Sequence, residues 1–380
     1  MKRKAVFRLF DRILGIPILV ILSLFKRKNR FLPVGTIRKI LIIKFAAIGD
    51  TILLIPMLRK LKSEYPDTEI TFLCSPINHE IIKTIPYIDK VIISRVYKFT
   101  TNPFKFIGFI REIRKVNYDV VIDTEQWSRL NSIITALSSN RFTIGFRTDN
   151  QHKHYNYDFV ILHSREKHEL ELFLELLTPL GIRSENNDTK LEYFLSDNNY
   201  KKAEQFWKEN NLSDRFVIIF HPGCGANGKP REWDDSNYIS LGRKLLLIGR
   251  NITILLTGSK DEYSKVSTIE KGIGTDIINI AGKYGLNDII AIISKAKFVI
   301  CSNSGMLHLA SCAGVKTIAL HGPTNPAKWG AYTDNSYVIK SDKYCSPCLY
   351  LGHDYGCKKP DCMQYITLDD VYKKALKIVK

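Results

Sequence analysis

Short, β-branched apolar runs alternate with segments of helical length, and this alternation constrains the fold more than any other feature of the chain. The runs form two series, separated by the polar stretch 195–215. They are Lys39 to Phe45, Glu69 to Cys74, Lys90 to Ser94, Asp119 to Asp123, Phe142 to Phe146, Phe216 to His221, Ile252 to Gly258, Asp276 to Gly282, Lys297 to Ser302 and Lys316 to Gly322. Runs of this kind are typical of parallel strands with helices on both faces of the sheet. The sequence therefore predicts an α/β protein with two Rossmann-like halves.

The boundary between the halves is expected near Thr189 to Ser196. This gives an N-terminal Rossmann-like domain over 31–195, a C-terminal one over 196–365 and a C-terminal helix over 366–380. A chain of 380 residues is long enough for two such cores. Because ligands bind outside the carboxyl ends of the strands in open sheets, we expect the site there, in the cleft of a two-domain protein.

The positive charge of the chain is concentrated at its N-terminus. Residues 1–30 hold nine basic residues and one acidic residue, and supply +8 of the net charge of +18. Between two basic clusters lies the apolar run Ile13 to Phe25. As a helix this run would be about 20 Å long, and a membrane span needs roughly 20 residues. The run ends in KRKNR, which disfavours a signal-peptide cleavage site.

Two interpretations of this segment stay open. In the first, residues 1–30 lie in the membrane interface, with the apolar face among the headgroups and the basic flanks on anionic lipid. In the second, the run is an ordinary helix packed on its own domain. The first interpretation makes an anionic membrane surface a partner of the protein.

Asp50 follows the first strand, at the start of an amphipathic helix. An Asp in this place can cap the helix N-terminus, which is worth about 1 kcal/mol. A carboxylate at the carboxyl end of a strand could also take a proton from an acceptor hydroxyl. Position alone favours the cap. No Gly-x-Gly-x-x-Gly motif follows this strand, which argues against a dehydrogenase.

Two loops of the second half have the composition of phosphate-binding loops. The first contains three glycines followed by Lys229 and Arg231. Its glycines let the backbone approach a ligand, and its cations can meet phosphate oxygens, although surface loops of this composition are also common. The second, Ser302 to Gly305, turns into a helix that begins near Met306 and whose free N–H groups attract a phosphate. His308, one turn into that helix, could donate to a diphosphate or be a buried histidine bonded within the protein.

Four of the eight cysteines cluster near the C-terminus, at Cys345, Cys348, Cys357 and Cys362. The first pair has the C-x2-C spacing of a zinc site, but the second pair is separated by four residues. A structural zinc site and reduced thiols in a packed loop both stay open. No acidic pair with metal-ligand spacing lies beside the other motifs, so we expect no divalent ion and no other cofactor in catalysis.

Taken together, these motifs resemble those of the ADP-heptose:lipopolysaccharide heptosyltransferases, glycosyltransferase family nine. The resemblance covers residues 38 to 365. The motifs that carry it are ILIIKFAAIGDTILLIPMLRKLKSEYPDTEITFL, YDVVIDTEQW, FHPGCGANGKPREW, SNSGMLHLASCAGVKTIALHGPTNPAKWG and the cysteine-rich stretch ending in CM. It implies the GT-B fold, in which two Rossmann-like domains face each other and the active site lies in the cleft.

The resemblance also implies roles in donor binding. Ser304, Gly305 and His308 match the loop that holds the donor diphosphate. Asn303 stands where the family often has Asp just before the Ser-Gly pair, and this departure puts the identity of the donor in doubt.

A phosphate-binding Lys lies two residues before a Trp in the family. In this chain that position is Arg231, and Lys229 is the alternative. Glu262, or its neighbour Asp261, is the nearest match to a carboxylate that contacts the nucleoside.

The mechanism implied by the resemblance is an inverting transfer without a metal. Asp50 matches the acceptor-activating base, which would deprotonate a sugar hydroxyl as it attacks the anomeric carbon from the face opposite the nucleotide. The cations and the helix N-terminus of the second half would stabilise the departing diphosphate. The implied donor is a nucleotide-diphosphate sugar, ADP-heptose, and the implied acceptor is a saccharide, in particular a lipid-linked one. The expected location is the cytoplasm, peripherally on the inner face of the cytoplasmic membrane.

Two other functions are weighed against this one. The first is another GT-B nucleotide-sugar enzyme, such as an epimerase. The second is a non-enzymatic nucleic-acid-binding protein, suggested by the net charge of +18. The sequence has no RNP, helix-turn-helix or zinc-finger signature, and its densest basic cluster surrounds an apolar run, which favours lipid as the partner. We therefore expect no nucleic acid as a partner.

Overall fold

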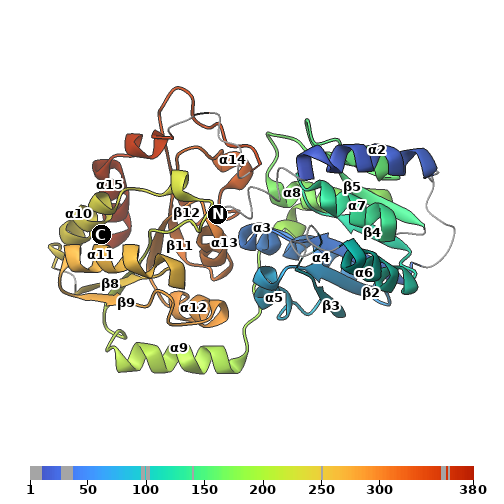
Figure 1. The fold of residues 1–380 in the computed structure, drawn as a ribbon. Coiled ribbons are helices and arrows are strands. Elements are labelled where there is room, and N and C mark those ends of the chain that lie inside the picture. The colour runs from blue at the N-terminus through green and yellow to red at the C-terminus, as the bar shows by residue number, and fades with distance from the viewer. Residues whose placement is uncertain are drawn as a thin grey trace. The chain divides into compact units, whose positions relative to one another are not determined.

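The computed structural model describes residues 11–26, 37–95, 99, 103–138, 141–249, 251–351, 357 and 360–380. The chain divides into two compact units, Met1–Lys190 (unit 1) and Leu191–Lys380 (unit 2), and the division lies in the stretch from Thr189 to Ser196. Each unit is built on one six-stranded parallel sheet covered by helices (Figure 1). The predicted α/β fold with two Rossmann-like halves is confirmed.

The sheet of unit 1 has the strand order β3-β2-β1-β4-β5-β6. Its strands are β1 (Lys39–Lys44), β2 (Glu69–Cys74), β3 (Lys90–Ile93), β4 (Val120–Asp123), β5 (Phe142–Arg147) and β6 (Phe159–Leu162). The chain starts in the middle of the sheet, winds outward to β3 and returns to β4 beside β1. The direction of winding therefore reverses between β1 and β4, where open α/β sheets bind ligands.

The helices of unit 1 cover both faces of this sheet. They are α2 (Gly15–Phe25), α3 (Ile48–Leu53), α4 (Ile55–Glu64), α5 (Pro76–Ile82), α6 (Pro103–Lys115), α7 (Arg129–Ser138) and α8 (Glu169–Glu175), with short 3-10 turns at η2 (Lys153–Asn156), η3 (Thr178–Leu180) and η4 (Asn186–Thr189). On one face, α7 lies between α2 and α6 and contacts both (Figure 1). Side chains of α6 and α7, such as Ile110 and Ile134, pack there against Leu41 and Val121 of the sheet.

Unit 2 repeats the strand order, as β12-β11-β10-β7-β8-β9. Its strands are β7 (Phe216–His221), β8 (Ile252–Leu256), β9 (Ile277–Asn279), β10 (Phe298–Ser302), β11 (Lys316–His321) and β12 (Ser336–Lys340). Its helices are α9 (Asp197–Glu209), α10 (Asp235–Leu246), α11 (Tyr263–Ile273), α12 (Leu286–Ile293), α13 (Gly305–Cys312), α14 (Pro326–Trp329) and α15 (Leu368–Val379), with 3-10 turns η5 (Lys229–Arg231), η6 (Lys260–Glu262) and η7 (Cys362–Tyr365). The winding reverses between β7 and β10, so the glycine-rich loop and the Ser-Gly loop start from neighbouring strands.

Helix α15 completes the core of unit 2. Its buried side chains Val371, Ala375 and Val379 belong to the same apolar cluster as residues of β7, β8, β10 and α10. The indole Nε1 of Trp233 donates to the backbone oxygen of Ile366, 2.8 Å away, which ties the segment before α15 to the start of α10.

Two strands, β6 and β12, were not predicted from the sequence. Both lie at an edge of their sheet, and in both the side chains are only partly buried or exposed. β6 is a run of four apolar residues, FVIL, and β12 is SYVIK, with polar residues at both ends. The remaining strands agree with the predicted runs to within a few residues at their ends.

The apolar N-terminal run forms α2, a helix that packs on unit 1. Pro17 lies in its first turn, where a missing N–H group costs little. Gly15 lies so close to α7 that a Cβ atom there would meet Cβ of Arg129 at 2.8 Å. The basic clusters at residues 2–8 and 27–30 lie outside the described residues. Over the described ranges, no helix combines the length and apolar character needed to cross a membrane.

Candidate functional site

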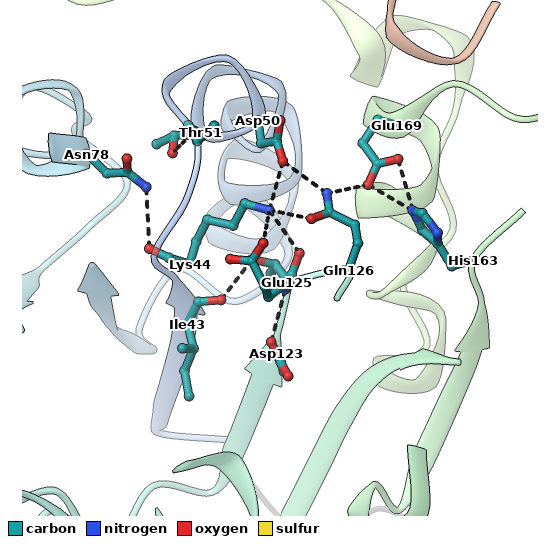
Figure 2. A network of polar contacts seen from close by, with 12 residues as sticks. Ile43, Lys44, Asp50, Thr51, Asn78, Asp123, Glu125, Gln126, His163 and Glu169 are labelled. Carbon is teal, nitrogen blue, oxygen red and sulfur yellow. Dashed lines mark hydrogen bonds and ion pairs between the residues drawn. The ribbon is translucent and has the colours of Figure 1, made fainter. Parts of the chain in front are cut away.

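A buried polar network occupies the carboxyl ends of β1, β4 and β6 in unit 1 (Figure 2). It consists of Lys44, Asp50, Glu125, Gln126, His163 and Glu169, and we call it the Lys44 network. Lys44 is the last residue of β1 and its side chain is fully buried. Its Nζ lies 3.0 Å from Oδ2 of Asp50 and 3.4 Å from Oε1 of Glu125. One buried ammonium group therefore holds two carboxylates that come from different segments.

Asp50 lies in the first turn of α3 and does not cap that helix. The N-cap residue is Ala47, and no side chain caps the helix there. The interpretation of Asp50 as a helix cap is therefore wrong, because its carboxylate turns to Lys44 and Gln126 instead. Asp50 has 19% of its side chain exposed and is therefore more accessible than Lys44, which is fully buried.

Gln126 joins the two sides of the Lys44 network. Its Oε1 accepts from Nζ of Lys44 at 2.9 Å. Its Nε2 donates to Oδ2 of Asp50 at 3.1 Å and to Oε1 of Glu169 at 2.6 Å. Only this orientation of the amide gives every partner the right polarity, since carboxylates accept and an ammonium group donates.

The same oxygen of Asp50, Oδ2, receives both the ammonium of Lys44 and the amide of Gln126. The other oxygen, Oδ1, has neither of these partners. The carboxylate is thus fixed through one oxygen and can present the other to a ligand.

Behind Gln126, Glu169 is held by His163. Both side chains are fully buried, and Nε2 of His163 lies 3.0 Å and 3.1 Å from the two carboxylate oxygens. Glu169 is the first residue of α8 and His163 follows β6, so the network reaches from the centre of the sheet to its edge.

The charges of the Lys44 network shift the titration of its buried members. Burial acts to lower the pKa of Lys44, but the negative charges of Glu125 and Asp50 outweigh it, so the pKa of Lys44 is raised. Burial raises the pKa of Glu125, and Lys44 offsets only part of this effect. Lys44 therefore remains an ammonium group at neutral pH, as required for holding the carboxylate of Asp50.

Two hydrogen bonds fix the loop that carries Glu125 and Gln126. Thr124 donates through Oγ1 to the backbone oxygen of Ile43 at 2.9 Å. The N–H of Glu125 donates to Oδ1 of Asp123 at 3.0 Å. These bonds set the position of Gln126 before α7 begins.

Of the six residues of the Lys44 network, only Asp50 is a site residue predicted from the sequence. The other five are Lys44, Glu125, Gln126, His163 and Glu169. Two signals were present. Lys44 is the charged residue that ends an otherwise apolar run, and Glu125 and Gln126 follow the run that forms the neighbouring strand. Lys44 and Gln126 are 82 positions apart in the sequence, and Gln126 and Glu169 are 43 positions apart, so their contacts follow only from the sheet order.

In unit 2, the loop after β10 leads directly into α13. Ser304 is the N-cap residue and Gly305 the first helical residue. His308 is buried one turn later. The side chain of Asn303 donates to the backbone oxygen of Trp329 at 2.6 Å, which holds the loop against α14. The predicted helix N-terminus is present, and Asn303 has a structural role in it.

The structure separates the two candidate cations. Nη1 of Arg231 donates to the backbone oxygen of Asn303 at 3.0 Å, so this side chain lies against the Ser-Gly loop. Within the described residues, Nε of Arg231 and Oγ of Ser304 are buried and have no hydrogen-bond partner. Lys229, at the other end of η5, is exposed. Arg231 therefore reaches the predicted diphosphate loop.

Glu262 lies beside the glycine-rich loop after β7. Its Oε1 accepts from the N–H of Gly225 at 2.8 Å, and its Oε2 accepts from the N–H and Oγ of Ser259, both at 2.8 Å. Burial acts to raise the pKa of Glu262, but these N–H donors hold it below the ordinary value. A Cβ atom on Gly223 would lie 2.1 Å from Oε1, so any larger residue there would displace the carboxylate of Glu262. Asp261 is exposed.

Among the described residues, no group of three or more His, Cys, Asp or Glu side chains is arranged to hold a metal ion. Of the clustered cysteines, Cys345 and Cys357 are exposed, Cys348 is partly buried and Cys362 is buried. Residues 352–356 and 358–359, which lie within this cluster, are outside the described part.

Known proteins resemble this chain in sequence and in fold. The sequence model of glycosyltransferase family 9 (heptosyltransferase) matches residues 107–359. Lipopolysaccharide heptosyltransferase 3 of Escherichia coli K12 is 27% identical over 301 residues, which are 78% of this chain and 86% of that protein.

Two solved structures extend the likeness to most of the chain. A family 9 glycosyltransferase from Veillonella parvula has a TM-score of 0.76 at 20% identity, and covers 91% of this chain and 98% of its own. Heptosyltransferase WaaC of E. coli, solved with ADP, has a TM-score of 0.67 at 18% identity, and covers 90% and 99%. These likenesses confirm the expected GT-B fold. Because the family match spans well over half of the sequence, the chain belongs to glycosyltransferase family 9, the heptosyltransferase family.

Proposed function

We propose that this glycosyltransferase moves a heptose from ADP-heptose to a saccharide of the lipopolysaccharide core, with inversion at the anomeric carbon and without a metal. The names of the relatives support the sugar and the acceptor, since the sequence relative is a lipopolysaccharide heptosyltransferase. The WaaC structure with ADP supports the nucleotide. The observation that carries the proposal is the arrangement around Asp50 in the Lys44 network.

Asp50 acts as the general base. Lys44 and Gln126 both bond Oδ2, which fixes the position of the carboxylate and leaves Oδ1 for the proton of the acceptor hydroxyl. A base must reach the proton that it takes, and the partly exposed side chain of Asp50 meets this condition. The hydroxyl oxygen then attacks the anomeric carbon, the bond to the diphosphate breaks, and Asp50 keeps the proton.

Unit 2 stabilises the leaving diphosphate. The N-terminus of α13 provides free N–H groups at Ser304 and Gly305. Arg231 provides a fixed positive charge beside them, which attracts a phosphate oxygen. His308 provides a further donor on the same helix. Groups that are already in place when negative charge develops lower the barrier more than groups that must move.

Glu262 contacts the nucleoside of the donor. Its carboxylate is held by backbone N–H groups of two loops, so it presents a fixed acceptor at the edge of the glycine-rich loop. The ribose hydroxyls are the donor groups that such a carboxylate binds. In this proposal the ribose of the nucleotide lies next to β7, and the diphosphate lies next to β10.

Replacing Asp50 by Asn tests the proposal. Asn keeps the shape and can accept the bonds from Lys44 and Gln126, but it cannot take a proton. We expect transfer to fall by roughly 10²–10⁴, while the melting temperature and the affinity for ADP-heptose stay near those of the native protein. The matched control is Asp67→Asn, the same change at an exposed position. Normal transfer by the Asp50 variant would remove this residue from the mechanism.

Product analysis in the same assay separates transfer from the epimerase alternative. A transferase gives a new glycosidic bond and free ADP, whereas an epimerase gives an isomer of the nucleotide sugar. Binding of nucleic acid, the other alternative, is measured by a gel-shift titration with DNA at several salt concentrations. We expect a new linkage and no specific shift.

We place the protein in the cytoplasm, peripherally on the inner face of the cytoplasmic membrane. A lipid-linked acceptor is confined to the membrane surface, and the basic N-terminal residues would be attracted to anionic lipid there.

A further inference from the structure

Helix α2 exposes large apolar side chains to solvent. Seven of the twenty exposed large apolar side chains in the described part of the chain lie between residues 13 and 25. Leu24 is 76% exposed and Phe25 is 83% exposed, and the helix has no charged residue from Gly15 to Phe25. A concentration of exposed apolar side chains marks a surface that binds a partner.

Helix α6, on the other side of α7, also exposes apolar side chains. Phe104 is 82% exposed and Ile107 is also exposed. The exposed positive side chains of α6 include Arg111 and Arg114. Figure 1 shows α2, α7 and α6 on the same side of the sheet of unit 1. We call the exposed side chains of α2 and α6 the α2–α6 face.

We propose that the α2–α6 face binds an anionic lipid surface and that it does so as a fixed part of unit 1. The proposal deepens the proposed function, on which it rests for the lipid-linked acceptor. The choice of lipid as the occupant follows from charge. Arg12 is exposed before α2, and Arg111 and Arg114 are exposed on α6. In the sequence, three more basic residues follow soon after α2, at Arg27, Lys28 and Arg30. Apolar side chains accompanied by positive charge match a layer of apolar chains under anionic headgroups.

The helix is held to unit 1 by polar contacts at both ends, unlike a tethered anchor. At its start, Asp11 accepts from the N–H groups of Arg129 at 3.2 Å and Leu130 at 2.8 Å, and pairs with Nη1 of Arg129 at 3.3 Å. At its end, Nζ of Lys26 bonds Oγ1 of Thr143 at 2.9 Å and pairs with Asp158 at 3.3 Å. The exposed side chains of α2 therefore keep one orientation relative to the sheet.

The contact at the start of α2 also leads to the Lys44 network. Arg129 is the first residue of α7, three positions after Gln126, which bonds Asp50. Asp11 thus fixes the start of the helix that follows the base-positioning loop. A lipid surface bound by the α2–α6 face would orient the acceptor side of unit 1, not merely raise its concentration at the membrane.

Vesicle flotation tests the proposal on the full chain. The vesicles contain phosphatidylethanolamine with anionic phosphatidylglycerol, and vesicles of phosphatidylcholine serve as the uncharged comparison. We expect binding to the anionic vesicles, and weaker binding at a salt concentration of about 0.5 M, where charges are screened within a few ångströms. The variant Leu24→Ser/Phe25→Ser should lose tenfold or more of the binding, and Phe104→Ser severalfold.

The matched control is Leu247→Ser, which removes a side chain that is 85% exposed in unit 2. This variant should bind vesicles as the native protein does. If Leu24→Ser/Phe25→Ser also bound normally, the proposal would be wrong. If that variant instead split a dimer in sedimentation and left vesicle binding unchanged, the face would be an interface between copies of the chain, which also overturns the proposal.

A second measurement does not depend on losing apolar side chains. Phe25→Trp adds a fluorescent residue on the face, and brominated lipids should quench it on binding, whereas Leu247→Trp should not be quenched. Transfer to a soluble acceptor analogue is measured on the same preparations. The face variants should keep this activity, while Asp50→Asn should lose it and still bind vesicles, so failure of one proposal is distinguishable from failure of the other.

Discussion

Replacing Lys44 by Met removes the positive charge at the centre of the Lys44 network and keeps most of the side-chain volume. Oδ2 of Asp50 and Oε1 of Glu125 then lose the ammonium group that lies 3.0 Å and 3.4 Å from them. Breaking a buried ion pair by removing one partner costs about 3–5 kcal/mol. Because Asp50 is partly exposed and can regain water, we expect a loss near the lower limit, about 3 kcal/mol.

A second substitution tests the cause of this loss. Glu125 is the more deeply buried of the two carboxylates paired with Lys44, with 2% of its side chain exposed. Changing it to Gln in the Lys44→Met background removes the unpaired negative charge, and we expect this to restore about 1–2 kcal/mol. The surface control is Lys83→Met, which breaks an exposed pair with Glu80 and should cost less than about 0.5 kcal/mol.

The assay must report on unit 1 alone, because a chain with two units need not unfold in one step. Urea titration followed by hydrogen exchange, read on peptides from β1 and β4, gives the free energy of unfolding of unit 1. Peptides from β7 and β10 serve as the internal reference and should not change. A loss below about 1 kcal/mol for Lys44→Met, or a double variant less stable than the single one, would refute the assignment of a charged network.

Three further outcomes are expected. Burial raises the pKa of Glu125, so the folded state binds the proton of this carboxyl more tightly than the unfolded state does. The free energy of unfolding should therefore fall as the pH rises from the ordinary pKa of a glutamate through the raised pKa of Glu125. In urea denaturation measured over this pH range, Glu125→Gln should show a smaller fall. Burial lowers the pKa of His321 to about 4. Between about pH 6.5 and pH 4 the imidazole therefore gains a proton only in the unfolded state, and up to about 3 kcal/mol of stability should be lost by about pH 4. His321→Asn should not show this loss in thermal melting over the same pH range. Arg231→Gln should weaken ADP-heptose binding about tenfold or more, whereas Lys229→Gln should change it less than about twofold, as measured by titration calorimetry.

The predicted strands were right where the chain is buried on both faces. Runs such as Phe216 to His221 contain little besides β-branched and aromatic residues, because a central parallel strand contacts helices above and below it. The edge strands β6 and β12 were missed, although β6 is itself an apolar run (FVIL) and the edge strands β3 and β9 were predicted. The order of the strands also follows a general pattern of doubly wound sheets, in which the chain winds from the centre to one edge, returns to the centre and then winds to the other edge.

The candidate site could be predicted only in part. Ser304, Gly305 and Asp50 follow strands, and position along the sequence is enough to find such residues. Whether Asp50 caps its helix could not be decided without Lys44 and Gln126, whose side chains meet it across the sheet. The sequence also left Arg231 and Lys229 as alternatives, because one turn of η5 directs two neighbouring cations to different surroundings.

The place of α15 in the core of unit 2 has a consequence for synthesis of the protein. Unit 1 is complete once residue 190 has been made, and domains fold in order as they leave the ribosome. Unit 2 keeps part of its apolar cluster uncovered until Val371, Ala375 and Val379 have emerged. The newly made chain therefore passes through a stage in which unit 1 is folded and unit 2 still awaits its last helix. Truncation before α15 would therefore leave unit 1 intact and unit 2 without part of its apolar core.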